Sequence, residues 1–496
     1  MILMIIAVAL LGDVYDDITV TRNPDPNYVA GTYEEWLEDQ PDFQPFFART
    51  IMGSDGAEFL LVFENGLTDS LEAGVLEQWT ADIASQGLSW EVVEVTYSTP
   101  EDLKSYLTDK YNDGLEGAVL VGILPTAWVM LENSFGGNEH FPCDYFLMDL
   151  DGTWEDLWVG YPSSGVPGSD GKYDTFSGSL DPEIYTGRIK VDNLNALGDP
   201  IEMLNDYIER NHVWRMNGGP DPLTALLYVD DDWAGWSGLQ ASMQHLYPNT
   251  ILVNDIYGTN GTDYLETRLP DAYVWISPFV HSSPNTHYWA QGPSTNWDEI
   301  VPANPQAHFY NLFACSNARF TTTRCMGAVY AFCTSAGLAS VGSTKTGSMM
   351  QFTQFYYPMG QGASIGEAYK DWWDYIATNG LSQDERSWHL GMVLLGDPSL
   401  MPAMHMLGIE DQSTETNTSS GLIIAENPCQ SELVLTYAEA QQGTVELYDT
   451  SGRLVASGTL EDSSCTLSLS SIQTGFYIVK VTAAGISAQT SVVILR

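Results

Sequence analysis

The hydrophobic positions of the chain change their spacing at about residue 421. Up to residue 402, short continuous apolar runs alternate with segments in which the apolar residues recur at helical spacing. Continuous apolar runs are typical of strands buried on both faces, and their alternation with helices predicts a parallel sheet covered on both sides. We therefore expect an α/β fold for this part of the chain.

The elements that this pattern predicts can be placed by residue number. Strands are expected at residues 58–63, 89–95, 117–122, 183–189, 223–229, 272–280, 308–314 and 337–342. Helices are expected at residues 100–113, 194–214, 327–336, 354–357 and 364–376. A polar stretch at 411–420 then leads to short alternating runs, such as 444–448 and 475–481, which predict an all-β sandwich.

These changes of pattern divide the chain of 496 residues into six predicted segments. They are a signal-peptide remnant (1–12), an N-terminal segment or possible propeptide (13–99), an N-terminal α/β subdomain (100–218), a second α/β subdomain (219–402), a linker (403–420) and a C-terminal β-sandwich (421–496). The first segment is apolar throughout, which suits a signal peptide but is too short to cross a bilayer. No later stretch reaches the ~18 apolar residues of a transmembrane helix.

Charge and cysteine content narrow the classes of function. The 65 acidic and 18 basic residues give a net charge of -47, which would repel phosphate backbones, so nucleic-acid binding is not expected. None of the six cysteines forms a Cys-x-x-Cys pair, which argues against a zinc ribbon or a thioredoxin-like motif. Cys429 and Cys465 lie in the same C-terminal segment and could form a disulfide in an oxidising compartment.

Two of the predicted strands end in a reactive side chain. The run at 272–280 is followed by His281, and the run at 308–314 is followed by Cys315. Because the ends of parallel strands meet at one edge of a sheet, both side chains should emerge there together. A thiol beside an imidazole is a nucleophile beside its base.

Other interpretations of these residues remain open. A cysteine in an apolar run is often an inert core residue, and Cys143, Cys325 and Cys333 are better interpreted in that way. His287 and His308 are rival bases, although one follows six residues after His281 and the other lies at the opposite end of the Cys315 strand.

Three aspartates, 230–232, end the strand at 223–229 and allow three interpretations. Asp232 could line a substrate pocket and favour arginine or lysine there. The three carboxylates could instead bind calcium, or they could form a solvated turn. Asp149 and Asp151 are a second, weaker calcium candidate. We therefore predict no defined metal site and no required cofactor, with calcium possible.

The C-terminal segment resembles the sorting domain of the bacterial type IX secretion system. The resemblance rests on Asn427-Pro428 and on the stretches 445–455 and 467–481, which fall in the expected order. It implies a signal-peptide-dependent export to the surface or medium of a Gram-negative bacterium, with the secretion machinery as a partner and the domain read as an address. A generic carbohydrate-binding or immunoglobulin-like sandwich is the alternative.

The segment at about 100–402 resembles the gingipain-type cysteine peptidases of family C25. The resemblance rests on the two strand ends at His281 and Cys315, on residues 337–344, and on the late Leu-Leu-Gly-Asp-Pro motif at 394–398. It implies a caspase-like, gingipain-like α/β fold in two subdomains, a Cys315 nucleophile with His281 as base and acid, and protein or peptide substrates. The backbone N–H groups of Ser282 and Cys315 are the candidate oxyanion donors.

Two residues depart from the family pattern. Ser282 replaces the glycine that usually follows the histidine, and Pro278 is unusual in a central strand. Two alternatives to a secreted cysteine endopeptidase therefore stay open. One is a catalytically decayed surface protein with a binding or adhesive role, and the other is an acetyl-transfer or ligase variant that uses the same thioester.

Overall fold

The structure, a computed structural model, describes two parts of the chain. The first comprises residues 30–220, 222–378 and 380–403, and the second comprises 422–424, 429, 431–437, 440–449, 453–470, 472, 475–483 and 486–494. The predicted signal-peptide remnant at 1–12 and all but the first residue of the predicted linker at 403–420 lie outside the described residues. Two compact units are formed, one mainly by the chain up to Ala403 and one mainly by the chain from Met404.

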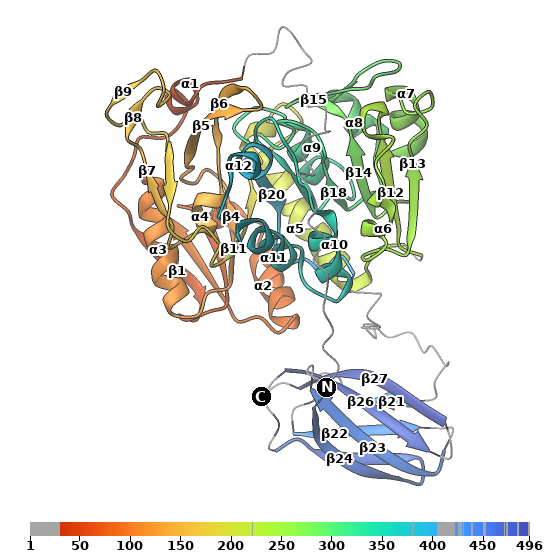
Figure 1. The fold of residues 1–496 in the computed structure, drawn as a ribbon. Coiled ribbons are helices and arrows are strands. Elements are labelled where there is room, and N and C mark those ends of the chain that lie inside the picture. Colours follow the sequence, from red (N-terminus) through yellow and green to blue (C-terminus); the bar gives the residue numbers. More distant parts are fainter. Residues whose placement is uncertain are drawn as a thin grey trace, which may run out of the picture. The chain divides into compact units, whose positions relative to one another are not determined.

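The first unit is built on one large sheet (Figure 1). Its eleven strands are β1 (Ala48–Gly53), β2 (Phe59–Glu64), β3 (Trp90–Val95), β4 (Gly117–Val121), β11 (Tyr185–Ile189), β12 (Thr224–Val229), β13 (Asn249–Val253), β14 (Trp275–Phe279), β18 (Phe309–Asn311), β19 (Ala339–Ser343) and β20 (Met392–Gly396). Their order across the sheet is β1-β3-β2-β4-β11-β20-β19-β18-β14-β12-β13.

The sheet is mixed, although a parallel sheet was predicted. The ladders β3-β2-β4-β11 and β19-β18-β14-β12-β13 are parallel, as the continuous apolar runs indicated. β1 is antiparallel to β3, and β20 is antiparallel to β19. The last strand, β20, also contacts β11 through Leu395 and Arg188, so the C-terminal end of this unit joins the two parallel ladders. The fold is therefore α/β with a large mixed sheet.

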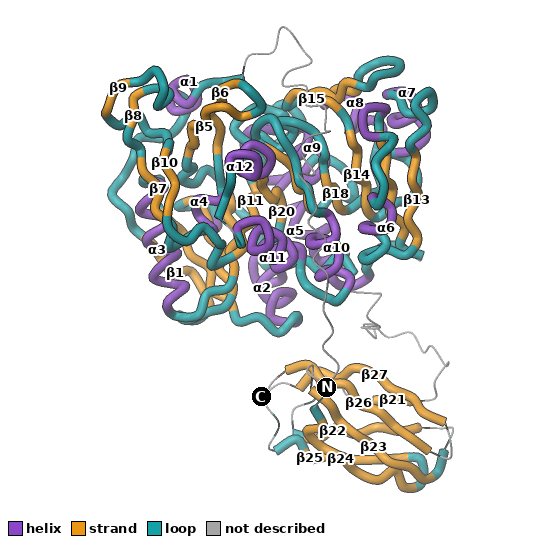
Figure 2. The backbone as a smooth tube through the Cα atoms, in the orientation of Figure 1, coloured by secondary structure: helices purple, strands orange, loops and turns teal. Residues whose placement is uncertain are grey.

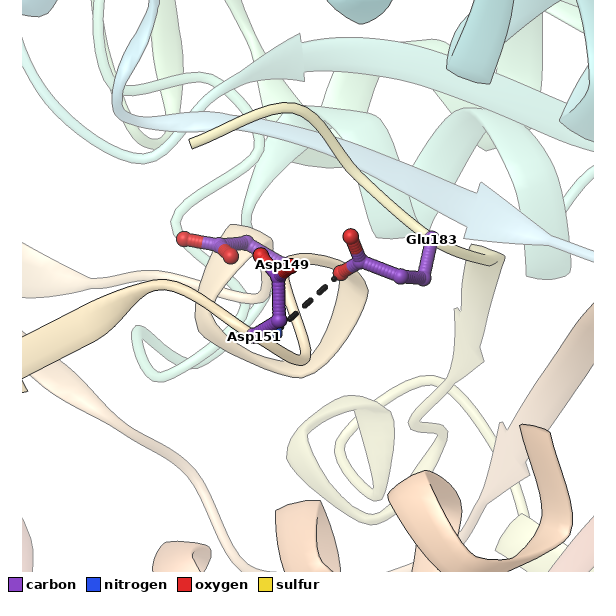
Figure 3. A group of neighbouring side chains, drawn as sticks. All are labelled: Asp149, Asp151 and Glu183. Carbon is purple, nitrogen blue, oxygen red and sulfur yellow. Dashed lines mark hydrogen bonds between the residues drawn. The ribbon is translucent and has the colours of Figure 1, made fainter. Parts of the chain in front are cut away.

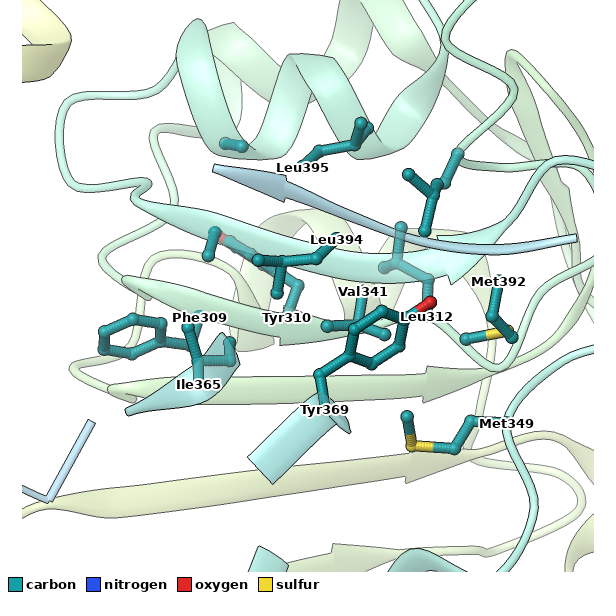
Figure 4. Packing of buried hydrophobic residues seen from close by; sticks show 14 of the residues in the cluster. Phe309, Tyr310, Leu312, Val341, Met349, Ile365, Tyr369, Met392, Leu394 and Leu395 are labelled. Carbon is teal, nitrogen blue, oxygen red and sulfur yellow. The ribbon is translucent and has the colours of Figure 1, made fainter. Parts of the chain in front are cut away.

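Helices lie on both faces of the sheet (Figure 2). The helices of this unit are α1 (Tyr33–Glu38), α2 (Val75–Ser85), α3 (Pro100–Asn112), α4 (Tyr145–Met148), α5 (Pro200–Asn217), α6 (Leu239–Met243), α7 (Gly261–Asp263), α8 (Trp297–Ala303), α9 (Met326–Phe332), α10 (Phe352–Gly360), α11 (Ile365–Ala377) and α12 (Gln383–His389). On β19, the Ser340 hydroxyl donates to the Gly327 carbonyl of α9. The next side chain, Val341, points to the opposite face, toward Tyr369 of α11 (Figure 4). This alternation buries β19 on both sides.

Small separate sheets of two or three strands accompany the large sheet. Their strands are β5 (Trp128–Ser134), β6 (Gly137–Pro142), β7 (Thr153–Glu155), β8 (Trp158–Val159), β9 (Val166–Pro167), β10 (Thr175–Ser177), β15 (His281–Ser283), β16 (Thr286–Tyr288) and β17 (Thr295–Asn296). Of these, β15 begins at the predicted site, and the β5–β6 hairpin carries Glu139 toward the loop after β19, where the Thr346 N–H donates to the Glu139 carboxylate at 3.2 Å.

Two predicted boundaries differ from the structure. β2 and β3 lie inside the large sheet and β2 pairs with β4, so the boundary placed after residue 99 does not separate two structural units. The helix predicted at 194–214 begins only at Pro200, because the Asp199 carboxylate caps it by accepting from the N–H groups of Ile201 and Glu202.

The C-terminal unit is all β, as predicted. Its strands are β21 (Leu422–Ile424), β22 (Glu432–Tyr437), β23 (Gln442–Asp449), β24 (Leu454–Glu461), β25 (Ser464–Ser468), β26 (Gly475–Ala483) and β27 (Ile486–Ile494). They follow the order β21-β22-β25-β24-β23-β26-β27, and every pair of these strands is antiparallel. Hydrogen bonds link all seven strands into a single sheet rather than two. This unit has a small apolar core of its own.

No disulfide joins Cys429 and Cys465 among the described residues of this unit. Cys465 lies on β25 opposite Leu435, whereas Cys429 bridges to Ile494 at the end of β27. Both thiols are buried in the small core, so their shared apolar surroundings account for their presence in this segment.

Candidate active site

His281 and Cys315 leave neighbouring strands at the same level. β14 and β18 are parallel neighbours, and beyond their regular ladder Phe279 bridges to Phe313. The Val280 N–H donates to the Phe313 carbonyl at 3.1 Å. Two residues past this bridge the chains reach His281 and Cys315, so the register of the sheet brings these two residues together at one edge.

Ser282 connects the two strand ends directly. Its hydroxyl donates to the carbonyl oxygen of Cys315 at 2.6 Å. A glycine at this position has no side chain and could not make this contact. The departure from the family pattern thus gives the protein an additional tie between the histidine and the cysteine loops, which the sequence did not reveal. Pro278 is accommodated in β14, and its carbonyl accepts from the Phe313 N–H at 3.0 Å.

The third neighbouring strand brings a carboxylate to the imidazole. β12 pairs with β14 on the side away from β18, and Asp232 follows its end by three residues. The Oδ2 atom of Asp232 lies 2.6 Å from Nε2 of His281. The Trp233 ring lies against the imidazole, with the ring centroids 4.7 Å apart. Three consecutive strands therefore place a carboxylate, an imidazole and a thiol along one edge.

Asp230, the first of the three aspartates, makes different contacts from Asp232, the last. Asp230 is almost fully buried, and its Oδ2 accepts from the Ala290 N–H at 2.8 Å. Burial raises the pKa of this carboxyl to about 6. Asp230 therefore holds the loop after β16, whereas Asp232 is hydrogen-bonded to His281.

Cys315 is a partly exposed residue, and its thiol lies in a mixed electrostatic environment. Burial raises the pKa of this thiol, and the backbone N–H of Gly347, which donates to the sulfur, works against that shift. The Glu139 carboxylate also raises the pKa, whereas the Lys345 ammonium lowers it. Ser316 has a φ of 60°, in the left-handed region, so the chain turns sharply directly after the thiol.

The rival side chains lie elsewhere. His287 is fully buried, with Nε2 3.1 Å from the Tyr330 hydroxyl, and burial lowers its pKa to about 3. Burial likewise lowers the pKa of His308 to about 4, at the start of the Cys315 strand. Cys325 and Cys333 flank α9, and burial raises the pKa of each thiol to about 12. The structure therefore offers no activated alternative among these residues.

The weaker calcium candidate is a cluster of carboxylates that already hold a loop (Figure 3). Oxygens of Asp149, Asp151 and Glu183 lie within 4.8 Å of one another. Asp149 accepts from the Gly152 N–H at 2.8 Å and from the Trp154 indole at 2.7 Å, and Glu183 accepts from the Asp151 N–H at 3.3 Å. These hydrogen bonds explain the cluster without an ion, and calcium binding stays a prediction.

A cavity of about 430 Å³ lies beside the candidate site. It is lined by the loop that follows Trp233 and by the segment that follows Gly347. Trp236, one of its walls, contacts the Phe313 ring with the centroids 5.4 Å apart. The lining residues are Gly235, Trp236, Ser237, Gly238, Leu239, Ser242, Met350, Gln351, Phe352 and Thr353. None of them carries a charge. A second cavity, of about 670 Å³, is lined by none of the predicted site residues.

A carboxylate, an imidazole and a thiol at adjacent strand ends of an α/β sheet define the class of candidate cysteine peptidases. The sequence model of peptidase family C25 matches residues 55–403, and that of the secretion system C-terminal sorting domain matches residues 426–495. The chain therefore belongs to peptidase family C25, the gingipain family, and carries a C-terminal sorting domain. The sorting domain directs secretion to the cell surface or the extracellular space by the type IX system.

Other comparisons add little. No curated protein gives a significant match. Among solved structures, the chain is similar to PorZ, a surface component of the type IX secretion system of Porphyromonas gingivalis, at 15% identity and a TM-score of 0.14, over 22% of this chain and 14% of PorZ. It is also similar to an endo-β-1,4-mannanase from Thermotoga petrophila, at 10% identity and a TM-score of 0.12, over 79% of this chain and 82% of the mannanase. Within the described residues, no helix has both the length and the apolar character needed to cross a membrane.

Proposed function

We propose that the protein is a secreted cysteine endopeptidase that hydrolyses peptide bonds through a thioester at Cys315. The observation that carries this proposal is the register of β12, β14 and β18, which sets Asp232 against His281 and aligns His281 with Cys315. Membership of family C25 supports it. The caspase-like division into two subdomains, with the second one catalytic, belongs to the same proposal.

The chemistry follows from the side chains present. The Cys315 sulfur attacks the peptide carbonyl after His281 has taken the thiol proton. The carbon–nitrogen bond breaks as His281 returns the proton to the leaving amine, and a thioester remains on Cys315. Water, deprotonated by His281, then hydrolyses the thioester and releases the acid. The backbone N–H groups of Ser282 and Cys315 are the proposed donors to the oxyanion.

Two roles can be proposed for Asp232. As a substrate-binding group it would favour arginine or lysine at the residue before the scissile bond. Its hydrogen bond to His281 instead favours an orienting role, in which the carboxylate fixes the imidazole and stabilises its protonated form. The neutral lining of the adjacent 430 Å³ cavity fits a neutral side chain at that substrate position.

Replacing Asp232 by asparagine separates these roles. If the carboxylate orients His281, kcat/KM should fall about 10²- to 10⁴-fold for every substrate, whatever residue precedes the scissile bond. If it binds the substrate, only substrates with arginine or lysine at that position should lose activity. Hydrolysis of a peptide panel by the two proteins measures both, and Asp231→Asn, which removes the neighbouring carboxylate of the same turn, serves as the control.

The proposed function itself is tested with an unfolded protein substrate. The wild-type protein should release new amino and carboxyl termini, which mass spectrometry identifies. Products joined to an added amine in place of water would identify an acyl transferase with the same thioester. Binding of the substrate without any cleavage or transfer would identify a decayed peptidase that serves as a surface binding protein.

A further inference from the structure

A buried lysine lies beside the loop that follows the candidate nucleophile. Lys345 comes two residues after β19, and its carbonyl oxygen accepts from the N–H of Ser316, the residue after Cys315, at 2.8 Å. Its side chain is 1% exposed. The ammonium donates to the carbonyls of Thr346 and Ser387, and it lies over the rings of Phe135 and Phe141 at 5.4 and 5.5 Å from their centroids. Burying an ammonium costs free energy unless the group is paired with an opposite charge and hydrogen-bonded.

A carboxylate of the opposite sign lies beside this lysine. Glu139, on β6, is 3.6 Å from the Lys345 ammonium, and its side chain is 19% exposed. Its carboxylate also accepts from the Ser134 hydroxyl at 2.8 Å and from the Thr346 N–H at 3.2 Å. Glu139 therefore forms an ion pair with Lys345 while it also accepts hydrogen bonds from two neighbouring donors.

We propose that Lys345 and Glu139 act as a pair of positioning residues that sets how readily the Cys315 thiol loses its proton. Lys345 favours the thiolate and Glu139 opposes it. The proposal deepens the proposed function, since the importance of the thiolate for peptide cleavage rests on it. Both charges act on the pKa of Cys315 in these opposite directions, on top of the larger effect of burial.

The other charged and titratable groups of this region are few. His281, hydrogen-bonded to Asp232, begins β15 and is the proposed base. His389 lies near Lys345, but burial lowers its pKa to about 3, so it stays neutral. The Arg319 guanidinium donates to the Thr344 and His140 carbonyls and belongs to the loop that follows Cys315. Lys345 and Glu139 form an ion pair, and Lys345 lies against the loop that follows Cys315 through its bond to the Ser316 N–H.

The test measures the rate at which iodoacetamide alkylates Cys315 as a function of pH, with the site assigned by mass spectrometry. Iodoacetamide is neutral and reacts with the thiolate, so the midpoint of the profile reports the thiol pKa. Glu139→Gln should move the midpoint down by about one unit and Lys345→Met should move it up by about one unit. At a pH below both midpoints these shifts change the alkylation rate about tenfold in opposite directions.

Controls separate the charge effect from a loss of structure. Lys172 is also buried, with Glu34 and Asp170 as its carboxylate partners, and Lys172→Met should leave the profile unchanged. Glu139→Gln keeps the shape of the side chain. If Lys345→Met does not fold, the shift of the alkylation midpoint in Glu139→Gln tests the proposal alone. Repeating the profiles in the His281→Ala background removes the imidazole titration.

Midpoints that stay in place, or that move in the same direction in both variants, would overturn the proposal. The measurement needs no peptide cleavage, so it reads the charge pair even if the protein proves not to be a peptidase. Conversely, normal peptide cleavage with unmoved midpoints would contradict the proposed role of Lys345 and Glu139 but would still support the proposed function.

Discussion

Replacing Cys315 by alanine is expected to reduce peptide hydrolysis by at least ~10³-fold, because the thioester can no longer form. The fold should survive, since Cys315 is only a partly buried residue and the loss of one sulfur atom leaves only a small gap at the edge of the sheet. Initial rates on a fluorogenic peptide, with thermal unfolding measured in parallel, give both quantities.

Cys333→Ala is the matched control for this experiment. Cys333 is also only partly buried, but it lies at the end of α9 rather than at the strand edge. Its replacement should leave the rate within about twofold of the wild type, by the usual small effect of changes remote from a site. Full activity of Cys315→Ala would contradict the proposed nucleophile, and loss of activity in both variants would point to damage of the fold.

Replacing Arg215 by methionine is expected to lower the free energy of unfolding by about 3–5 kcal/mol, because it leaves a buried carboxylate without its cation. Asp397, in the late Leu-Leu-Gly-Asp-Pro motif, is fully buried and accepts from Arg215 at 2.7 Å, from Trp79 at 2.8 Å and from Asn211 at 2.9 Å. These contacts join β20 to α2 and α5. Urea unfolding at neutral pH measures the loss.

The pH dependence of this loss follows from the direction of the pKa shift. Burial alone would raise the pKa of Asp397, but Arg215 and the hydrogen bonds hold it below its usual value. The ionised carboxylate therefore stabilises the fold above the unfolded pKa of about 4, and this contribution disappears as the pH falls through the lower folded value. The difference between wild type and Arg215→Met should shrink in acid.

Lys370→Met is the control for the stability experiment. Lys370 pairs with Asp374 one helical turn away on α11, and both side chains are partly exposed. Exposed pairs of this kind contribute less than about 0.5 kcal/mol, so this variant should unfold close to the wild type. Equal losses in the two variants would contradict the account of the buried network.

Much of the sheet could be predicted because buried strands read as continuous apolar runs. The runs at 58–63, 117–122 and 337–342 correspond to β2, β4 and β19 to within a few residues. The direction of β20 could not be predicted, since an apolar run does not record which way it enters a sheet. The late start of α5 depends on a capping contact of Asp199, whose side chain could equally have capped a turn.

In the candidate site, too, some features were predictable from the sequence and others were not. The positions of His281 and Cys315 at neighbouring strand ends were predictable from the runs that precede them. The hydrogen bond from Ser282 to the Cys315 carbonyl and the contact of Asp232 with His281 were not, because they depend on the register between strands far apart in the sequence. The burial of Lys345 could not be predicted, since nothing in the neighbouring sequence indicates that its side chain is buried.

Labelling of the secreted protein tests the central claim most directly. The wild-type protein is treated, in reductant, with peptidyl acyloxymethyl ketones that differ in the residue next to the reactive group, and the labelled cysteine is identified by mass spectrometry. The account predicts selective labelling of Cys315 that disappears in His281→Ala, strongest with a probe that carries a neutral residue. Labelling of Cys315 that is unchanged in His281→Ala, or no labelling by any probe in folded protein, would contradict it.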